Sequence, residues 1–118
     1  NPTRDLTYVN DTANGFIEIM RTNNLIGQAT NIGTNNEISI ENLANLIFDL
    51  MGEEIIIKPD DKRIRPKNSE VERLYCDNTK ILENTKWTPK YDLKQGLKNT
   101  INWIKDNLDI YKSNIYNI

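Results

Sequence analysis

Short β-favouring runs alternate with amphipathic helical patterns along the 118 residues of this chain. The runs that favour strands cover residues 6–9, 28–32, 54–57 and 74–76. Strand-like and helical segments that alternate in this way are typical of an α/β domain. Because a chain of this length builds one hydrophobic core rather than two, we predict a small mixed α/β domain of short strands and about four helices over residues 1–118.

Each helical pattern follows a residue whose side chain can cap a helix: Asp11, Ser39, Asp77 and Asp92. The first helix is expected to bury its apolar residues Phe16, Ile17 and Met20. In the last helix, Asp92 and Gln95 predict a reciprocal cap, which a continuous apolar stripe follows. Residues 111–118 carry no strong pattern, so we expect this tail to fray.

The chain contains no histidine and a single cysteine, Cys76. These counts exclude a Ser-His-Asp triad, a Cys-His pair, histidine-based metal sites, a structural zinc site and an internal disulfide. We therefore predict no metal site, and we expect a reducing, cytoplasmic setting. The 15 basic and 17 acidic residues nearly balance, which disfavours a nucleic-acid binder, and the apolar runs are too short to span a membrane.

The glycines and carboxylates predict neither a cofactor site nor a catalytic residue in this chain. None of the five glycines falls in a Gly-x-Gly-x-x-Gly or Gly-x-x-x-x-Gly-Lys pattern, so no phosphate-binding loop of the dinucleotide or P-loop kind is encoded. The carboxylates form no pairing that differs from ordinary surface charge.

Two arginine features are candidates for binding an anion. Arg4 stands just before a predicted strand, and Arg63 and Arg65 lie in the polar loop of residues 59–69. Guanidinium groups stay charged and bind phosphate oxygens bidentately, so arginines that converge from separate loops would hold a diphosphate. The alternative is that these are solvated surface arginines paired with Asp5 or Glu70.

Five motifs follow one another along the chain in the order found in one enzyme family. The first is Arg4-Asp5-Leu6-Thr7-Tyr8-Val9-Asn10-Asp11, which resembles the Arg-Asp-aromatic-x-Tyr-Val-x-Asp signature of the extended short-chain dehydrogenases that act on nucleotide sugars. The others are residues 31–40, Arg65-Pro66, Asp77-x-x-Lys80, and Trp87-x-Pro89 with its following helix. The string of residues 65–74 is most similar to nucleotide-sugar 4,6-dehydratases, especially those that act on UDP-N-acetylglucosamine.

The resemblance implies a role for each candidate binding residue. Arg4 and Arg65 would hold the substrate diphosphate from opposite sides of a cleft. Arg63 and Arg73 lie close by and would assist, and Asn35 stands on a turn that could approach the nucleotide. For Ser39 a helix cap is preferred. The resemblance also implies a nucleotide-sugar ligand, which we expect to be UDP-linked, and a homo-oligomeric parent.

The family binds NAD through a Gly-rich amino-terminal half and uses a Tyr-x-x-x-Lys pair, and this chain has neither of them. We therefore expect it to be the carboxy-terminal, substrate-binding part of a longer enzyme, inactive alone. Two alternatives stay open: a part of a 4-epimerase, or a free-standing, non-catalytic sugar-nucleotide-binding module. A free-standing module would close its apolar surface, whereas a severed domain would expose an apolar patch.

Overall fold

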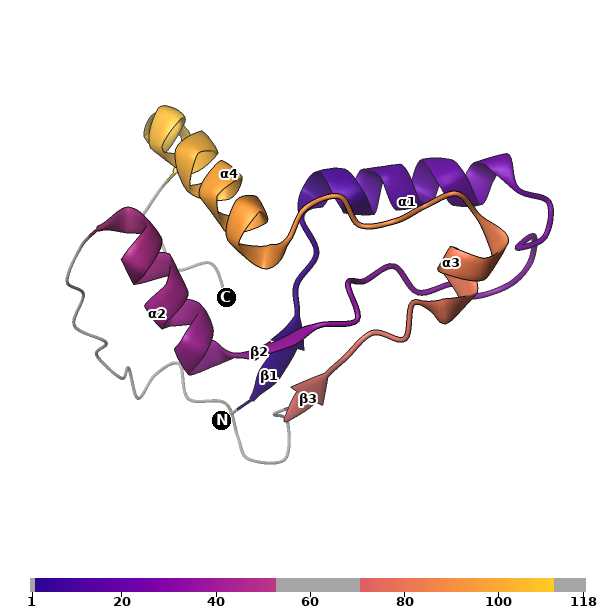
Figure 1. Ribbon diagram of the computed structural model, residues 1–118. Helices are drawn as coiled ribbons and strands as arrows, with labels where there is room; N and C mark the ends of the chain where they lie inside the picture. Colours follow the sequence, from indigo (N-terminus) through magenta and orange to yellow (C-terminus); the bar gives the residue numbers. More distant parts are fainter. Residues whose placement is uncertain (1, 53–70, 112–118) are drawn as a thin grey trace.

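The computed structural model describes residues 2–52 and 71–111. In chain order the elements are β1 (Thr3–Asp5), α1 (Val9–Arg21), β2 (Glu37–Ser39), α2 (Ile40–Met51), β3 (Arg73–Leu74), α3 (Thr79–Asn84), α4 (Leu93–Asp106) and the 3₁₀ turn η3 (Leu108–Ile110). The described residues form four α-helices and one small sheet, and in the view of Figure 1 the helices lie above the sheet and to either side of it. This arrangement confirms the predicted fold class. Of the tail that we expected to fray, only Tyr111 lies within the described residues.

The sheet has the strand order β2-β1-β3, so β1 lies at its centre. β1 runs antiparallel to β2, with Arg4 opposite Ile38, and parallel to β3, with Arg4 opposite Leu74. The predicted strand at residues 74–76 is therefore confirmed only at Leu74. The strand predicted at residues 54–57 lies outside the described residues.

Two strand predictions were wrong. The first strand lies at residues 3–5 rather than 6–9, because residues 3–5 are the ones that pair with β2 and β3, while Val9 already belongs to α1. Residues 28–32 form no strand. Hydrogen bonds to α3 and the residues just before it hold this segment instead: Lys80 Nζ donates to the carbonyl of Ala29 at 3.0 Å, and Asn31 Nδ2 donates to the carbonyl of Asp77 at 3.4 Å.

Helix α1 buries the face opposite to the one we predicted. Its buried residues are Asp11 and Gly15, and Gly15 packs so closely on Ile32 that an added Cβ would lie 2.9 Å from that side chain. Phe16, Ile17 and Met20 were expected in the core, but 62%, 42% and 82% of their surfaces are exposed. The described residues therefore cover one side of α1 and leave its apolar side uncovered.

Asp11 is fully buried and ties α1 to the segment that precedes α4. Its two carboxylate oxygens accept the backbone N–H groups of Lys90 at 3.0 Å and Tyr91 at 3.1 Å. Its backbone carbonyl accepts the indole N–H of buried Trp87 at 2.8 Å. The prediction that Asp11 caps the helix was wrong, because the helix begins at Val9 with Tyr8 in the cap position. The Asp11 carboxylate instead accepts hydrogen bonds from residues far away in the sequence.

The caps of the two longest later helices follow the prediction. Ser39 Oγ accepts the N–H of Asn42 at the start of α2, and Asp92 and Gln95 form a reciprocal capping box at the start of α4. At α3 the cap position is Asn78 rather than Asp77. Asp77 accepts the N–H of Thr79 at 3.0 Å, and hydrogen bonds from Thr79 lower the pKa of its carboxyl group.

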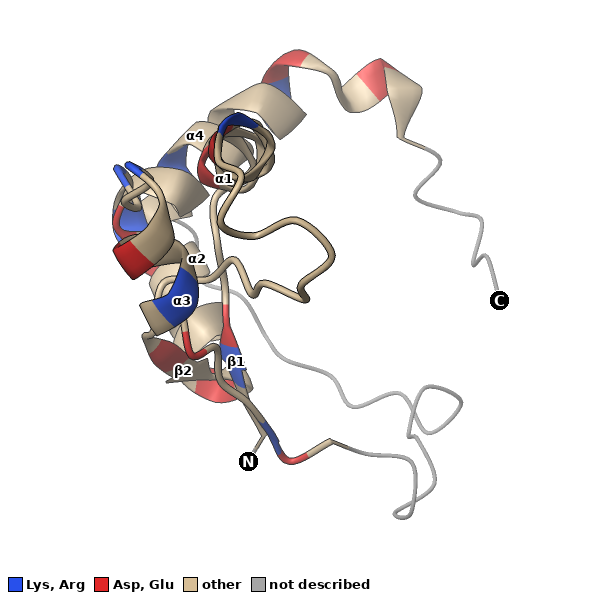
Figure 2. Cartoon of the chain, turned by 90° about the vertical axis from the view of Figure 1, so that its right-hand side faces the viewer, with Lys and Arg blue, Asp and Glu red and all other residues tan. Residues whose placement is uncertain are grey.

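Figure 2 shows basic residues interspersed with acidic ones over the described helices and strands. Among residues 2–52 and 71–111, no helix is long and apolar enough to cross a membrane.

Replacing Asp11 by Ala should destabilise the chain by about 2–4 kcal/mol, because two inward-facing N–H groups would lose their acceptors. The measurement is the urea midpoint of unfolding. The matched control is Asp106→Ala at the exposed end of α4, which should change stability by less than about 0.5 kcal/mol. Equal midpoints for the two variants would contradict the role assigned to Asp11.

Candidate functional site

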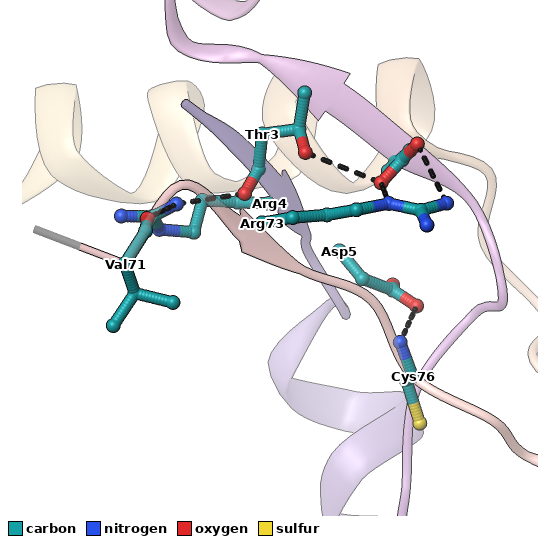
Figure 3. A network of polar contacts seen from close by, with 7 residues as sticks. Thr3, Arg4, Asp5, Val71, Arg73 and Cys76 are labelled. Carbon is teal, nitrogen blue, oxygen red and sulfur yellow. Dashed lines mark hydrogen bonds and ion pairs between the residues drawn. The ribbon is translucent and has the colours of Figure 1, made fainter. Parts of the chain in front are cut away.

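The central strand β1 positions Arg4, the first residue of the predicted diphosphate grip. Arg4 Nη1 donates to the carbonyl of Thr3 at 2.7 Å and to the carbonyl of Val71 at 2.9 Å. Figure 3 shows the Arg4 side chain reaching toward Val71 and away from Cys76. The guanidinium is therefore held where the described chain resumes before β3. Arg63 and Arg65 lie outside the described residues, so their approach to Arg4 stays a prediction.

Asn35 lies in the turn of residues 33–36, called here the Asn35 turn, which connects residues 28–32 to β2. Its φ of 56° is in the left-handed region, which asparagine tolerates better than most residues. Gly33 is buried in the same turn, where an added Cβ would overlap the side chain of Cys76. Only glycine allows this close approach. Ser39 caps α2, as preferred from the sequence.

Asp5 links β1 to this turn and to the segment after β3, a role that its position in the sequence motif does not reveal. Asp5 Oδ1 accepts the Thr34 hydroxyl at 2.6 Å and the Thr34 N–H at 3.1 Å. Asp5 Oδ2 accepts the Cys76 N–H at 3.3 Å. Burial, reinforced by the charges of Asp5 and Asp77, raises the pKa of the Cys76 thiol, so this cysteine is disfavoured as a nucleophile.

Arg73 crosses the sheet from β3 to β2. Its guanidinium forms a bidentate pair with Glu37, at 2.7 Å from Nε and 3.0 Å from Nη2, and lies 4.8 Å from the centre of the Tyr75 ring. The hydroxyl of Thr3 on β1 donates to the same carboxylate at 3.2 Å. Arg73, with Thr3, holds the pKa of Glu37 below its ordinary value. In Figure 3 the Arg73 side chain points away from Val71.

A pocket of about 390 Å³ lies beside the Asn35 turn. Its lining includes Thr34 and Asn36 on one side and Lys90, Tyr91 and Asp92 on the other. Neither Arg4 nor Asn35 lines this pocket. Within residues 2–52 and 71–111, no three acidic, cysteine or histidine residues come together as metal ligands could.

The Arg73–Glu37 pair predicts a pH-dependent stability. A carboxyl group whose pKa falls on folding stabilises the fold above its ordinary pKa of 4.5, and that contribution is lost as the pH drops through the lowered folded value. Glu37→Gln should therefore lower the urea midpoint of unfolding at pH 7. The gap between the midpoints of the natural chain and the variant should become smaller as the pH is lowered toward 3. Glu83→Gln, on the exposed surface of α3, is the control. A gap that keeps its full size at pH 3 would refute the assignment.

Comparison with known proteins finds a matching family model and several similar proteins. The family model of GDP-mannose 4,6 dehydratase matches residues 1–100. A Methanocaldococcus jannaschii protein provisionally named a UDP-glucose 4-epimerase is 37% identical over 107 residues, which are 91% of this chain and 32% of that protein. The human dTDP-D-glucose 4,6-dehydratase is 29% identical over 116 residues, with 94% and 32% covered.

Solved structures agree with the fold. The dTDP-glucose 4,6-dehydratase of Bacillus anthracis in complex with NAD superimposes with a TM-score of 0.75 at 26% identity, over 94% of this chain and 34% of that one. The chain thus spans about a third of the length of the relatives it matches. On the family match and these likenesses, the chain belongs to the GDP-mannose 4,6-dehydratase family, among the NAD-dependent epimerases and dehydratases of the extended short-chain dehydrogenase type.

Proposed function

We propose that this chain is the substrate-binding part of an NAD-dependent nucleotide-sugar 4,6-dehydratase. The parent enzyme would oxidise C4 of a nucleotide-bound hexose, eliminate water across C5 and C6, and return the hydride to C6. Support comes from the family match together with the human and Bacillus anthracis 4,6-dehydratases among the relatives. The similarity of residues 65–74 to dehydratases of UDP-N-acetylglucosamine makes a UDP-linked amino sugar our proposed substrate.

The observation that carries the proposal is the anchored guanidinium of Arg4 within the matching Arg-Asp motif. Two backbone carbonyls, from Thr3 and Val71, fix its position. A guanidinium fixed in this way binds phosphate oxygens without first losing much side-chain entropy. The diphosphate does not react, so its binding energy positions the sugar at the reacting centre. In our proposal Arg65 and Arg63 grip the diphosphate from the other side, and Asn35 approaches the nucleotide.

The residues of this chain do not suit an NAD site of their own. Its glycines form no dinucleotide-binding pattern, and no tyrosine is followed by lysine at the fourth position. NAD and the acid–base residues would therefore come from another part of the parent enzyme. The role of this chain is to bind and orient the sugar nucleotide.

The uncovered side of α1 supports a place within a larger enzyme. Its exposed apolar residues are spaced along one side of the helix: Val9, Phe16, Ile17 and Met20. Isolated exposed apolar residues are ordinary, but a stripe of four on one helix marks a contact surface. We propose that the NAD-binding part of the same polypeptide covers it. A free-standing module would have no partner for this surface.

A 4-epimerase is the second candidate, because the Methanocaldococcus jannaschii relative named as such has a higher identity, 37%, than the human dehydratase, 29%. The two reactions share oxidation at C4, and only the dehydratase then loses water. Incubating the parent enzyme with UDP-N-acetylglucosamine distinguishes them by product mass. Loss of one water indicates a dehydratase, and an unchanged mass with inverted C4 indicates an epimerase.

The first test of the parent enzyme is the coding sequence upstream of Asn1, read in frame for about two hundred codons, roughly the size of a dinucleotide-binding domain. We expect a Gly-rich strand-turn-helix pattern and a Tyr-x-x-x-Lys pair. A stop codon or unrelated sequence there would refute the catalytic part of the proposal.

Arg4→Ala in the parent enzyme should weaken binding of the UDP-sugar by about ten- to a hundredfold, because a charge-assisted contact to the diphosphate is lost. Isothermal titration with UDP measures the effect directly. Arg21→Ala, which breaks an exposed ion pair with Glu18, is the matched control and should leave the affinity unchanged. Unchanged UDP affinity in Arg4→Ala would remove Arg4 from the site.

The 118-residue chain alone should self-associate through the uncovered side of α1. Replacing Phe16 and Met20 by Ser should shift it toward the monomer in sedimentation velocity, since both side chains are mostly exposed. The control is Ile26→Ser, at a residue that is 74% exposed and lies beyond the helix. An equal shift in the control would show that apolar exposure in general, and not this surface, drives the association.

A further inference from the structure

The Asp5 carboxylate lies where three separate segments of the chain meet. It accepts the N–H and the hydroxyl of Thr34 on one oxygen and the N–H of Cys76 on the other. These bonds join β1 to the turn before β2 and to the segment after β3. A carboxylate can accept all of them together because each of its oxygens has two acceptor positions.

The same turn is held from its other side by α3. Buried Asn78, at the cap position of α3, donates from Nδ2 to the carbonyl of Gly33 at 2.9 Å. Gly33 itself packs against Cys76 with no room for a Cβ. The carbonyl of Gly33 and the N–H of Thr34 belong to the same peptide group, so Asn78 and Asp5 together fix that peptide plane. Asn35 follows immediately, in its left-handed conformation.

Arg4 and Asp5 are neighbours on β1, and successive side chains of a strand point to opposite faces of the sheet. One short strand thus carries Arg4, the arginine proposed to bind the diphosphate, on one face. On the other face it carries Asp5, which holds the Asn35 turn. Pairing with β2 and β3 on both sides fixes the strand. A displacement of β1 would move both Arg4 and the turn.

We propose that Asp5 is a positioning residue, which orders the Thr34–Asn35 turn so that Asn35 meets the nucleotide part of the sugar nucleotide. This inference rests on the proposed function, because the contact between Asn35 and the nucleotide belongs to it. Asp5 itself does not touch the substrate. Both carboxylate oxygens are needed, because three hydrogen-bond donors face them. The amide of an asparagine would replace one of these oxygens by an NH₂ group, which is itself a donor.

The test compares variants of the intact parent enzyme with UDP-N-acetylglucosamine as the probe. Asp5→Asn and Thr34→Val should raise KM about five- to tenfold and leave kcat within about twofold, because a contact to the non-reacting nucleotide is weakened equally in ground and transition states. Hydrogen exchange should become faster in peptides that span residues 33–36. Thr34→Ser keeps the hydroxyl and should restore the natural KM.

The control for a general loss of stability is Ile81→Val, a truncation at a fully buried residue of α3. It should lower the urea midpoint and leave KM unchanged. An equal rise of KM in Ile81→Val, or an unchanged KM and exchange rate in Asp5→Asn, would overturn the inference. If the natural enzyme binds no UDP-sugar, the proposed function fails, and with it the substrate part of the inference. The exchange measurement then still decides whether Asp5 orders the turn.

Discussion

The buried carboxylate of Asp11 is the interaction on which the arrangement of the helices depends. An unpaired buried charge is costly, so the fold must supply donors to it. The backbone N–H groups of Lys90 and Tyr91 donate to the carboxylate. The indole N–H of Trp87 donates to the backbone carbonyl of Asp11 in the first turn of α1. These bonds fix the segment that leads into α4. Because residues 87–91 must lie against the start of α1, the place where α4 begins follows from the same contacts.

The sheet depends on side chains as much as on its backbone ladder. β3 has only two residues, and β1 and β2 have three each. The bidentate pair between Arg73 and Glu37 spans all three strands, and Asp5 ties the central strand to the turn before β2. Arg4 lies on that central strand, so the contacts that stabilise the sheet also fix the position of the arginine that is proposed to bind the diphosphate.

The apolar side of α1 was predicted to be buried, and it is exposed. The spacing of Phe16, Ile17 and Met20 correctly indicates an amphipathic helix, but a pattern does not tell what covers its apolar side. Within the described residues, α1 instead turns Asp11 and Gly15 inward. A chain that spans about a third of the length of its relatives leaves room for a covering partner elsewhere in the polypeptide, as we propose.

Features that depend on neighbours in the sequence could be predicted from the sequence alone. Ser39 bonds the N–H three residues later, and Asp92 and Gln95 cap each other, because these signals are local. The resemblance to the family, which the family match confirms, came from five motifs in order along the chain. Tertiary structure decided the rest. Asp11 meets Lys90 across 79 residues and Asp5 meets Cys76 across 71, and no local propensity encodes such pairings. The strand at residues 3–5 likewise exists because β2 and β3 lie beside it, not because its residues favour strands more than residues 6–9 do.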